Sequence, residues 1–400
     1  MPRVLHIIDS LAQTGTARQL RQVAQGLAES GFDVHIAVLN ATPNKVSTSC
    51  PKGVADGSAF QCSSIPMVNL GRRWSLDPLA DLQLAKHVAR LQPDVVHTWN
   101  SVPGMFGPIV ANWTRRQRGR LRRGAWARWG ASCEPADGPR LVVGQYRIER
   151  WPAAWNTWVE RRFARHAARY ISNSSIVRDW CVARGLRDQR FTVIPPGVPE
   201  ARPSDVSHEE LLRELKLPAD ARLIGVVGRL IPEKRVRDLI WAADLLRVLH
   251  DNLRLLVIGD GPERSTLERF ASLSSDLDHI RFLGVRDDVW RIMPHLDVLW
   301  NGSDNRSVST SILEAMAAGV PVVASDVPVN RELVLEGETG YLFPIGSRAG
   351  RADRARHTDR IFTDASLAAC LGAASRKRVA GQFSVERMVS DHAKLYRQLC

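Results

Sequence analysis

The sequence contains no apolar run long enough to cross a membrane. No stretch approaches the roughly eighteen consecutive apolar residues that suggest a transmembrane helix. The first residues, MPRVLHIIDSL, hold a short apolar run that includes His6 and Asp9. They predict a first strand and not a secretory signal peptide.

Cysteine pairs and metal-ligand spacings are also missing. The six cysteines include no C-x-x-C pair, and the eleven histidines include no H-x-x-x-H pair, so no metal site is predicted. No disulfide framework is predicted either, although Cys50 and Cys62 could pair within one loop. No Ser/His/Asp or Cys/His arrangement for nucleophilic catalysis can be identified. We therefore expect a chain of the reducing cytoplasm that binds no metal.

The composition is that of an ordinary globular protein with an excess of basic residues. Hydrophobic residues make up 44% of the sequence and charged residues 24%. A chain of 400 residues is too long for one hydrophobic core, so we predict two domains. Lys and Arg exceed Asp and Glu by 55 to 42, a net charge of +13. A basic surface favours anionic partners such as nucleotides, anionic lipid or nucleic acid.

Short apolar runs alternate with helical patterns along the whole chain. VLHIID, VHIAVL, DVVHTWN, LVVGQY, YISNSS and FTVIPPGV form a first series, with helices predicted in TARQLRQVAQGLAESG and DPLADLQLAKHVARL. After a proline-rich linker at about 195–207, RLIGVVGRL, LRLLVIGDG, HIRFLG, LDVLWNG, VPVVASD and GYLFPI form a second series. The pattern predicts two Rossmann-like, doubly wound α/β domains that share an inter-domain cleft, with ligands beyond the carboxyl ends of the strands.

Two charged stretches interrupt this pattern. Residues 113–129, WTRRQRGRLRRGAWARW, hold seven arginines and three tryptophans and no acidic residue. They fit a solvated basic loop or a segment on an anionic membrane surface, where each basic residue contributes roughly 1 kcal/mol. No nucleic-acid motif accompanies them, so no nucleic-acid partner is expected. Residues 347–360, SRAGRADRARHTDR, predict a surface loop.

Candidate chemistry lies at the predicted strand ends. Arg229 and Lys234 in VVGRLIPEK stand between a strand and a helix, where two cations and a helix N-terminus suit a diphosphate. His97, at the end of VVHTWN, is either structural or in contact with substrate. Gly15, in AQTGTARQL, lies in a turn that can face the cleft.

The stretch SDNRSVSTSILEAMAAG raises a third possibility. Ser311 and Glu314 fit a capping box, S-x-x-E, in which each side chain bonds the backbone of the other. Ser309 and Thr310 belong to the same polar helix start, directly beyond a strand, where the phosphates or hydroxyls of a nucleotide-sugar could bind. The capping box and a binding role for Glu314 are compatible.

Five ordered motifs together resemble a known family. VGRLIPEK, VIGDGPE, FLGVRDDV, ILEAMAAGVPVVASDVPVNRELV and EGETGYLFP are similar to the retaining glycosyltransferases of family four, which have the two-domain GT-B fold. The match is dense over most of 195–345. It continues more loosely through LHIIDSLAQTGTARQL, PDVVHTWNS and FSVERMVSDHAKLYRQL.

The resemblance implies a division of labour between domains. Residues 1–196, with a basic insertion at about 113–140, would bind a glycan or lipid-linked acceptor. Residues 197–382 would bind the nucleoside-diphosphate sugar, and a last helix within 383–400 would cross back to the first domain. The implied activity is that of a metal-independent hexosyltransferase of surface polysaccharide or glycolipid synthesis. We expect such an enzyme to lie on the inner face of the plasma membrane, with 113–129 as the segment that contacts the membrane.

The resemblance also implies roles for single residues. Arg229 and Lys234 match the family's diphosphate-binding pair, and Glu314 matches the second Glu of its E-x7-E signature, at the nucleotide ribose. Residues 284–289, which include Gly284, Val285 and Val289, match the segment whose backbone meets the base. Gly15 matches a glycine-rich turn near the phosphates.

Three positions depart from the family pattern. The first Glu of the signature falls on Arg306, the glycine pair of the N-terminal turn reads Thr14-Gly15, and a histidine of the first domain falls near Arg147. Arg306 therefore decides between an altered donor and lost catalysis. The alternatives are a catalytically silent relative that binds nucleotide-sugar or glycan as an assembly partner, and an epimerase, for which no extra acid/base residues can be placed.

Overall fold

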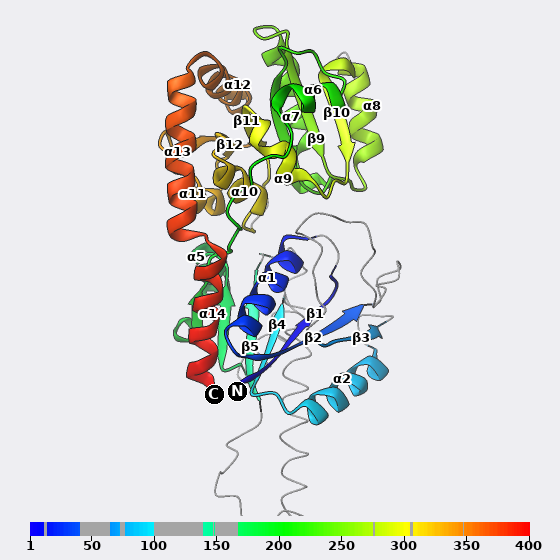
Figure 1. Cartoon of the computed structure of the whole chain (residues 1–400), viewed down its shortest axis with the longest axis vertical. Coiled ribbons are helices and arrows are strands. Elements are labelled where there is room, and N and C mark those ends of the chain that lie inside the picture. Colours follow the sequence, from blue (N-terminus) through cyan, green and yellow to red (C-terminus); the bar gives the residue numbers. More distant parts are fainter. Residues whose placement is uncertain are drawn as a thin grey trace, which may run out of the picture. The chain divides into compact units, whose positions relative to one another are not determined.

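The computed structural model describes residues 1–11, 14–40, 65–72, 77–99, 139–146, 148, 167–274, 277–304, 307–346 and 348–400. The chain divides into two compact units (Figure 1). The N-terminal unit comprises Met1–Gly197 together with Val385–Cys400, and the C-terminal unit comprises Val198–Ser384. The predicted boundaries, after residues 196 and 382, lie within two residues of these.

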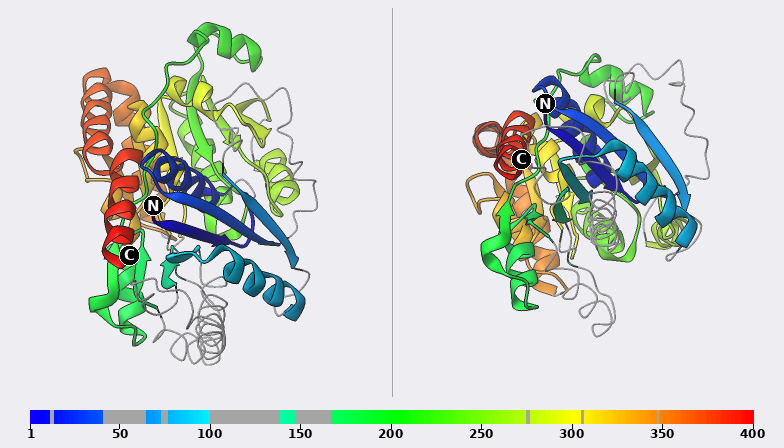
Figure 2. Two further views of the ribbon diagram at one scale, coloured as in Figure 1. Left: turned by 60° about the horizontal axis from the view of Figure 1, so that its bottom comes forward. Right: turned by 90° about the horizontal axis from the view of Figure 1, so that it is seen from below.

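The N-terminal unit is built on a parallel sheet of seven strands in the order β3-β2-β1-β4-β5-β6-β7. Its strands are β1 (Arg3–Ile8), β2 (Asp33–Asn40), β3 (Met67–Arg72), β4 (Val95–Trp99), β5 (Arg140–Gln145), β6 (Arg169–Ser172) and β7 (Phe191–Val193). One face packs against α1 (Gly15–Glu29) and α14 (Val385–Leu399), and the other against α2 (Pro78–Leu91) and α5 (Ser175–Ala183), so both faces are covered (Figure 2).

The C-terminal unit is built on a second parallel sheet, of six strands in the order β10-β9-β8-β11-β12-β13. Its strands are β8 (Arg222–Val227), β9 (Leu253–Ile258), β10 (Ile280–Gly284), β11 (Val298–Asn301), β12 (Val322–Ser325) and β13 (Gly340–Phe343). Helices α7 (Val236–Arg247), α8 (Arg264–Ser274) and α12 (Arg348–Thr363) contribute to the core on one face. The other core holds α6 (His208–Glu214), α9 (Val289–Ile292), α10 (Thr310–Ala318) and α11 (Pro328–Leu333), and α13 (Ala365–Gln382) reaches both cores.

The C-terminal helix α14 belongs to the N-terminal unit although it follows the C-terminal unit in sequence. Its buried side chains include Met388, Ala393 and Tyr396, and they share a core with α1. Figure 1 shows α14 beside α1. The two helices touch closely, because a Cβ atom at Gly26 of α1 would stand 2.6 Å from a methyl group of Val389. This close approach explains why a glycine is needed on the inner face of α1.

The prediction of two doubly wound parallel sheets is confirmed, and each predicted strand is present. One strand, β3, was not predicted. The prediction of a surface loop at 347–360 is wrong, because this stretch forms most of α12. Its inner face carries polar groups with partners: Arg354 donates to the Asp238 carbonyl oxygen at 2.9 Å, and Thr358 accepts from the Trp300 indole at 2.9 Å.

Candidate functional site

The carboxyl edge of the C-terminal sheet brings three loops into backbone contact. Gly228, Gly259 and Gly284 follow or end β8, β9 and β10, and all three have positive φ angles. The Gly259 amide donates to the Gly284 carbonyl oxygen at 2.7 Å, and a Cβ atom at Gly259 would stand 2.0 Å from the Gly228 carbonyl oxygen. Because no side chain fits at Gly259, these loops pack backbone against backbone at the edge where parallel sheets bind ligands.

The two predicted cations lie on the first of these loops. Arg229 is exposed and directly follows Gly228, whereas Lys234 is half-buried and ends a short 3-10 helix, Pro232–Lys234. The Lys234 side chain lies over the end of β8, since its Cε would be 3.6 Å from a Cβ atom at Gly228. Burial lowers the pKa of the Lys234 ammonium below its ordinary value of 10.5. An anion at this edge would offset the desolvation of that charge.

The residues that follow β11 are bonded to the same 3-10 helix. The Asp304 amide donates to the Glu233 carbonyl oxygen at 2.9 Å, and the Ser303 hydroxyl donates to the same oxygen at 3.3 Å. Ser325, the last residue of β12, donates in turn to the Ser303 carbonyl oxygen. Residues 303 and 304, after β11, are therefore held against the 3-10 helix that Lys234 ends.

The predicted capping box at Ser311 and Glu314 is wrong. The helix begins at Thr310 with Ser309 as its N-cap, so Ser311 already lies in the first turn. The Ser309 hydroxyl bonds Asn301 and Ser311, each at 3.0 Å, and makes no side-chain cap bond. The buried Asn301 amide donates to the Ser309 hydroxyl oxygen, which would otherwise accept from a backbone amide of the helix. The first amides of α10 keep their affinity for an oxygen ligand.

The remaining predicted donor residues lie at this edge or in α10. Glu314 is a half-buried residue of α10. Gly284 is buried, Val285 is 60% exposed, and Val289 is the first residue of α9. The exposed Val285 offers an apolar surface at this edge of the sheet. Arg306 and Arg147 lie outside the described residues.

In the N-terminal unit the prediction that His97 contacts substrate is wrong. His97 is fully buried, and its ring nitrogens bond the hydroxyls of Tyr396, at 2.6 Å, and Tyr146, at 3.1 Å. Burial, with a smaller effect from His6 and His392, holds the pKa of His97 well below 6.5. His97 is therefore a neutral core residue that helps to anchor α14 to the sheet.

The buried cluster around His97 also includes Trp99 and His6, and the Trp99 indole donates to His6 Nδ1 at 3.0 Å.

The start of α1 differs from the prediction. Gly15, predicted to lie in a turn, is instead the first residue of α1, and the Thr14 hydroxyl caps that helix by accepting from the Ala17 amide at 3.2 Å. That Gly15 lies near the phosphates of the donor stays a prediction.

Two further predictions concern metal and membrane. Among the described residues, no group of three or more His, Cys, Asp or Glu side chains could hold a metal ion. In the same part of the chain, no helix combines the length and hydropathy needed to cross a bilayer. The basic stretch 113–129 falls outside the described residues.

Comparisons with known proteins agree with this architecture. The family model described as Glycosyltransferase Family 4 matches residues 14–202, and that described as Glycosyl transferases group 1 matches residues 207–378. EpsD of Bacillus subtilis is 27% identical over 315 residues, 78% of this chain and 79% of that protein. The 2-deoxystreptamine glucosyltransferase of Streptomyces kanamyceticus is 31% identical over 62% of this chain and 65% of that protein.

A third relative matches over a shorter span. The N-acetyl-alpha-D-glucosaminyl L-malate synthase of Bacillus anthracis is 30% identical over 47% of this chain, and the match spans about half of its own length, 48%.

Solved structures match the whole chain. HepE from Anabaena, in complex with UDP and glucose, superposes with a TM-score of 0.79 at 19% identity, and the match covers 100% of both chains. WaaG, a glycosyltransferase involved in lipopolysaccharide biosynthesis, superposes with a TM-score of 0.69 at 15% identity over 98% of this chain and 99% of that one. At this identity the superpositions show the fold, which is GT-B. The two family models cover nearly all of the sequence, and the chain belongs to the group 1 and family 4 glycosyltransferases.

Proposed function

We propose that the chain transfers a sugar from a nucleoside-diphosphate sugar to a glycan or lipid-linked acceptor, with retention of configuration. The observation that carries this proposal is the carboxyl edge of the C-terminal sheet. There, Arg229, the desolvated Lys234 and the uncapped start of α10 follow strands of one parallel sheet. Cations and a helix N-terminus without a side-chain cap at such an edge suit a diphosphate.

The chemistry follows from the charge that develops as the donor breaks. Departure of the nucleoside diphosphate places negative charge on its leaving oxygen, and Arg229 and Lys234 stabilise that charge by direct contact. The sugar passes through an oxocarbenium-like state, and the acceptor hydroxyl enters from the face that the diphosphate leaves. Thr310, Ser311 and Glu314 are assigned to donor hydroxyls, and Gly284, Val285 and Val289 to the base.

Metal independence is part of the proposal. Two cationic side chains and a helix N-terminus can supply the positive charge that a divalent ion provides in other transferases. The measurement is the transfer rate after exhaustive treatment with EDTA, which should stay within about twofold of the untreated rate. A rate that collapses and returns with added Mg²⁺ or Mn²⁺ would assign the charge to a metal.

A role in polysaccharide or glycolipid synthesis is supported by a further relative, the lipopolysaccharide core biosynthesis glycosyltransferase LpsE of Rhizobium meliloti, which is 30% identical over 46% of this chain. The relatives named above do not fix the sugar or the acceptor, since two of them are a 2-deoxystreptamine glucosyltransferase and an N-acetyl-alpha-D-glucosaminyl L-malate synthase. For a lipid-linked acceptor we assign membrane contact to 113–129. Replacing the arginines from Arg115 to Arg123 with glutamine should release the protein from anionic vesicles, and unchanged binding would exclude this contact.

A panel of UDP-, GDP- and ADP-sugars tests the central proposal. Transfer or slow donor hydrolysis with one member supports an active transferase. The second candidate, a silent relative, is favoured by one observation: Arg306 stands where the family pattern has its first Glu. Nucleotide-sugar or glycan binding without turnover for any donor and acceptor would select that candidate, and absence of both nucleotide and glycan binding would refute both.

A further inference from the structure

The segment between β10 and α9 has little secondary structure of its own to fix it. Gly284 ends β10 in a left-handed conformation, φ 69°, and the pairing of β10 with β9 is irregular just before it. The helix that follows, α9, is only four residues long, and its N-cap residue Asp288 makes no side-chain cap bond. Side chains must therefore determine where residues 284–289 lie.

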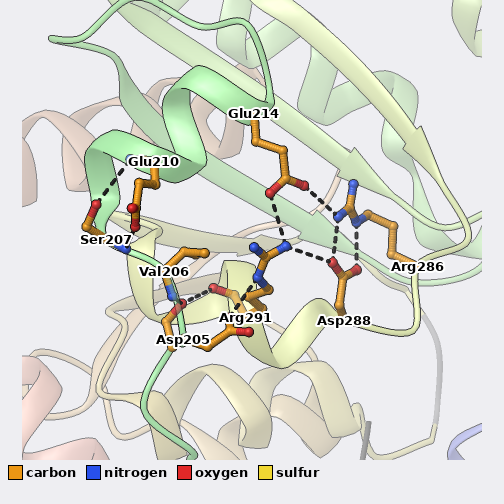
Figure 3. Close-up of polar contacts among 9 residues, drawn as sticks. Asp205, Val206, Ser207, Glu210, Glu214, Arg286, Asp288 and Arg291 are labelled. Carbon is orange, nitrogen blue, oxygen red and sulfur yellow. Dashed lines mark hydrogen bonds and ion pairs between the residues drawn. The ribbon is translucent and has the colours of Figure 1, made fainter. Parts of the chain in front are cut away.

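An ion network supplies this constraint. Within the segment, Arg286 makes a bidentate contact with Asp288: Nε donates to Oδ1 at 2.7 Å and Nη2 donates to Oδ2 at 2.6 Å. From outside, Glu214 accepts from Arg286 at 3.3 Å and from Arg291 at 3.0 Å (Figure 3). Arg291 also bonds Asp205, Nε to Oδ1, at 2.7 Å. We call these five residues, Asp205, Glu214, Arg286, Asp288 and Arg291, the arginine network.

The arginines of the network and Asp288 are only partly exposed and strongly paired, whereas Asp205 at its rim is 62% exposed. The side chains of Arg286 and Arg291 are both 23% exposed, and that of Asp288 is 29% exposed. The Arg286 guanidinium holds the pKa of Asp288 below its ordinary value of 3.8, so the carboxylate stays charged at neutral pH. The Arg286–Asp288 contact is bidentate, and single bonds connect it to the other members. Such a connected set of charges constrains geometry better than an isolated surface pair.

Its outer anchors are themselves fixed. Glu214 ends α6, whose Leu211 and Leu212 are buried in the core of the C-terminal unit. A capping box between Ser207 and Glu210, with bonds of 3.2 and 2.8 Å, holds the start of the same helix (Figure 3). The segment 284–289 is thus tied to a helix that cannot shift without disturbing the core.

A second tie runs to the stretch that leads into the C-terminal unit. The Ser204 hydroxyl donates to the Arg291 carbonyl oxygen at 3.0 Å and accepts from the Val206 amide at 3.3 Å. Arg291 is consequently held at both ends, by its guanidinium on Asp205 and Glu214 and by its carbonyl on Ser204. It is the residue through which α6 and the entering chain act on α9.

We infer that the arginine network positions the segment 284–289 for the nucleobase of the donor, which makes Arg291 a positioning residue for donor binding. This inference rests on the proposed function, because it assigns Val285 and its neighbouring backbone to the base. Loss of the network should weaken only the part of the affinity that the base supplies. The diphosphate contacts of Arg229 and Lys234 lie on a different loop and should persist.

The test compares two ligands that differ only in the base. Calorimetric titration of the full chain with UDP, GDP and ADP identifies the nucleotide that binds most tightly, and ribose 5-diphosphate serves as its baseless counterpart. Arg291→Met and Glu214→Gln should lower the affinity for the nucleotide by about two- to thirty-fold, the range typical of coupling residues. The affinity for ribose 5-diphosphate should stay unchanged.

Two further variants separate positioning from a general loss of structure. Arg291→Lys keeps one charge beside Glu214 and should restore part of the nucleotide affinity. Arg222→Met serves as a matched control, because Arg222 is held by Asp297 at 2.7 Å at the start of β8, the opposite edge of the same sheet. This control should leave both affinities unchanged. In turnover assays the Arg291→Met variant should raise the donor KM while kcat stays within about twofold.

The outcomes distinguish this inference from the function on which it rests. A wild-type chain that binds none of the three nucleotides overturns both. Two other outcomes overturn the inference and leave the proposed function standing, provided that the wild type binds a nucleotide tightly. In the first, the variants lose equal affinity for the nucleotide and for ribose 5-diphosphate. In the second, neither Arg291→Met nor Glu214→Gln loses affinity for either ligand.

Discussion

Replacing Lys234 with methionine removes one positive charge from the proposed diphosphate site and keeps most of the side-chain volume. The ammonium lies over the end of β8 and is desolvated there, so water screens it less than a surface lysine. Loss of one such electrostatic contact in a preorganised site costs about 3 kcal/mol of transition-state stabilisation. At about 1.4 kcal/mol per tenfold change, kcat/KM should fall about a hundredfold. Arg229 should still supply its own share of the transition-state stabilisation.

The same substitution should not destabilise the fold. Because burial lowers the pKa of Lys234, its charged form is disfavoured in the folded chain relative to the unfolded one. That penalty is fully present below the lowered pKa, shrinks as pH rises above it, and is gone above 10.5. Over the same interval Lys234 loses its charge, so the wild type should lose donor affinity. A methionine carries no such penalty at any pH, and the free energy of unfolding should not decrease.

The assay is transfer from the best donor of the panel, run beside urea unfolding of the same preparations. Lys377→Met is the matched control, since Lys377 is an exposed lysine of α13 in the same unit, and it should leave both quantities unchanged. Lys234→Arg should keep the charge without the loss of affinity at high pH. Undiminished kcat/KM in Lys234→Met, with intact folding, would remove this residue from the mechanism.

Three other outcomes are expected. Gly259→Ala should lose about 3 kcal/mol or more of unfolding free energy in urea, because its Cβ would stand 2.0 Å from the Gly228 carbonyl oxygen at φ 134°; an unchanged midpoint would contradict the packing described. The pKa values of His6 and His392 are lowered to about 3 and about 4, so stability should be full above pH 6.5 and fall below it. In His392→Met the slope should shrink by about 1.4 kcal/mol per pH unit at most, and an unaltered slope would exclude this histidine. Arg306→Glu, which restores the family pattern, should shift the preferred donor or raise turnover, and an identical donor profile would remove Arg306 from donor choice.

Much of the fold was predictable because apolar patterning decides strand and helix placement in parallel α/β domains. Each predicted strand lies between covering helices, and both faces of each sheet are buried, so the signal repeats along the chain. The exceptions are the strand β3 and the helix α12, and the inner face of α12 carries Arg354 and Thr358. A helix that buries polar groups against carbonyl and indole partners has no apolar period, and its partners lie far away in sequence.

The site was predictable in its position and less so in its bonding. Motif order places Arg229 and Lys234 at the correct sheet edge, since a strand followed by a turn and helix ends there. The run SVSTS offers several possible N-caps, and Asn301, on β11, selects Ser309. His97 was misread for a similar reason: its partner Tyr396 comes from α14, almost the whole chain away. Local sequence cannot show contacts of this range.

The return of α14 to the N-terminal unit makes the C-terminal unit, in effect, an insertion within another domain. During synthesis the inserted unit can finish folding while the N-terminal core still lacks the helix that covers α1. A cut after Gly197 would leave that apolar face bare, and a chimaera that exchanges donor specificity should be joined at Gly197/Val198 and Ser384/Val385. Each half of such a hybrid would then keep its own hydrophobic core.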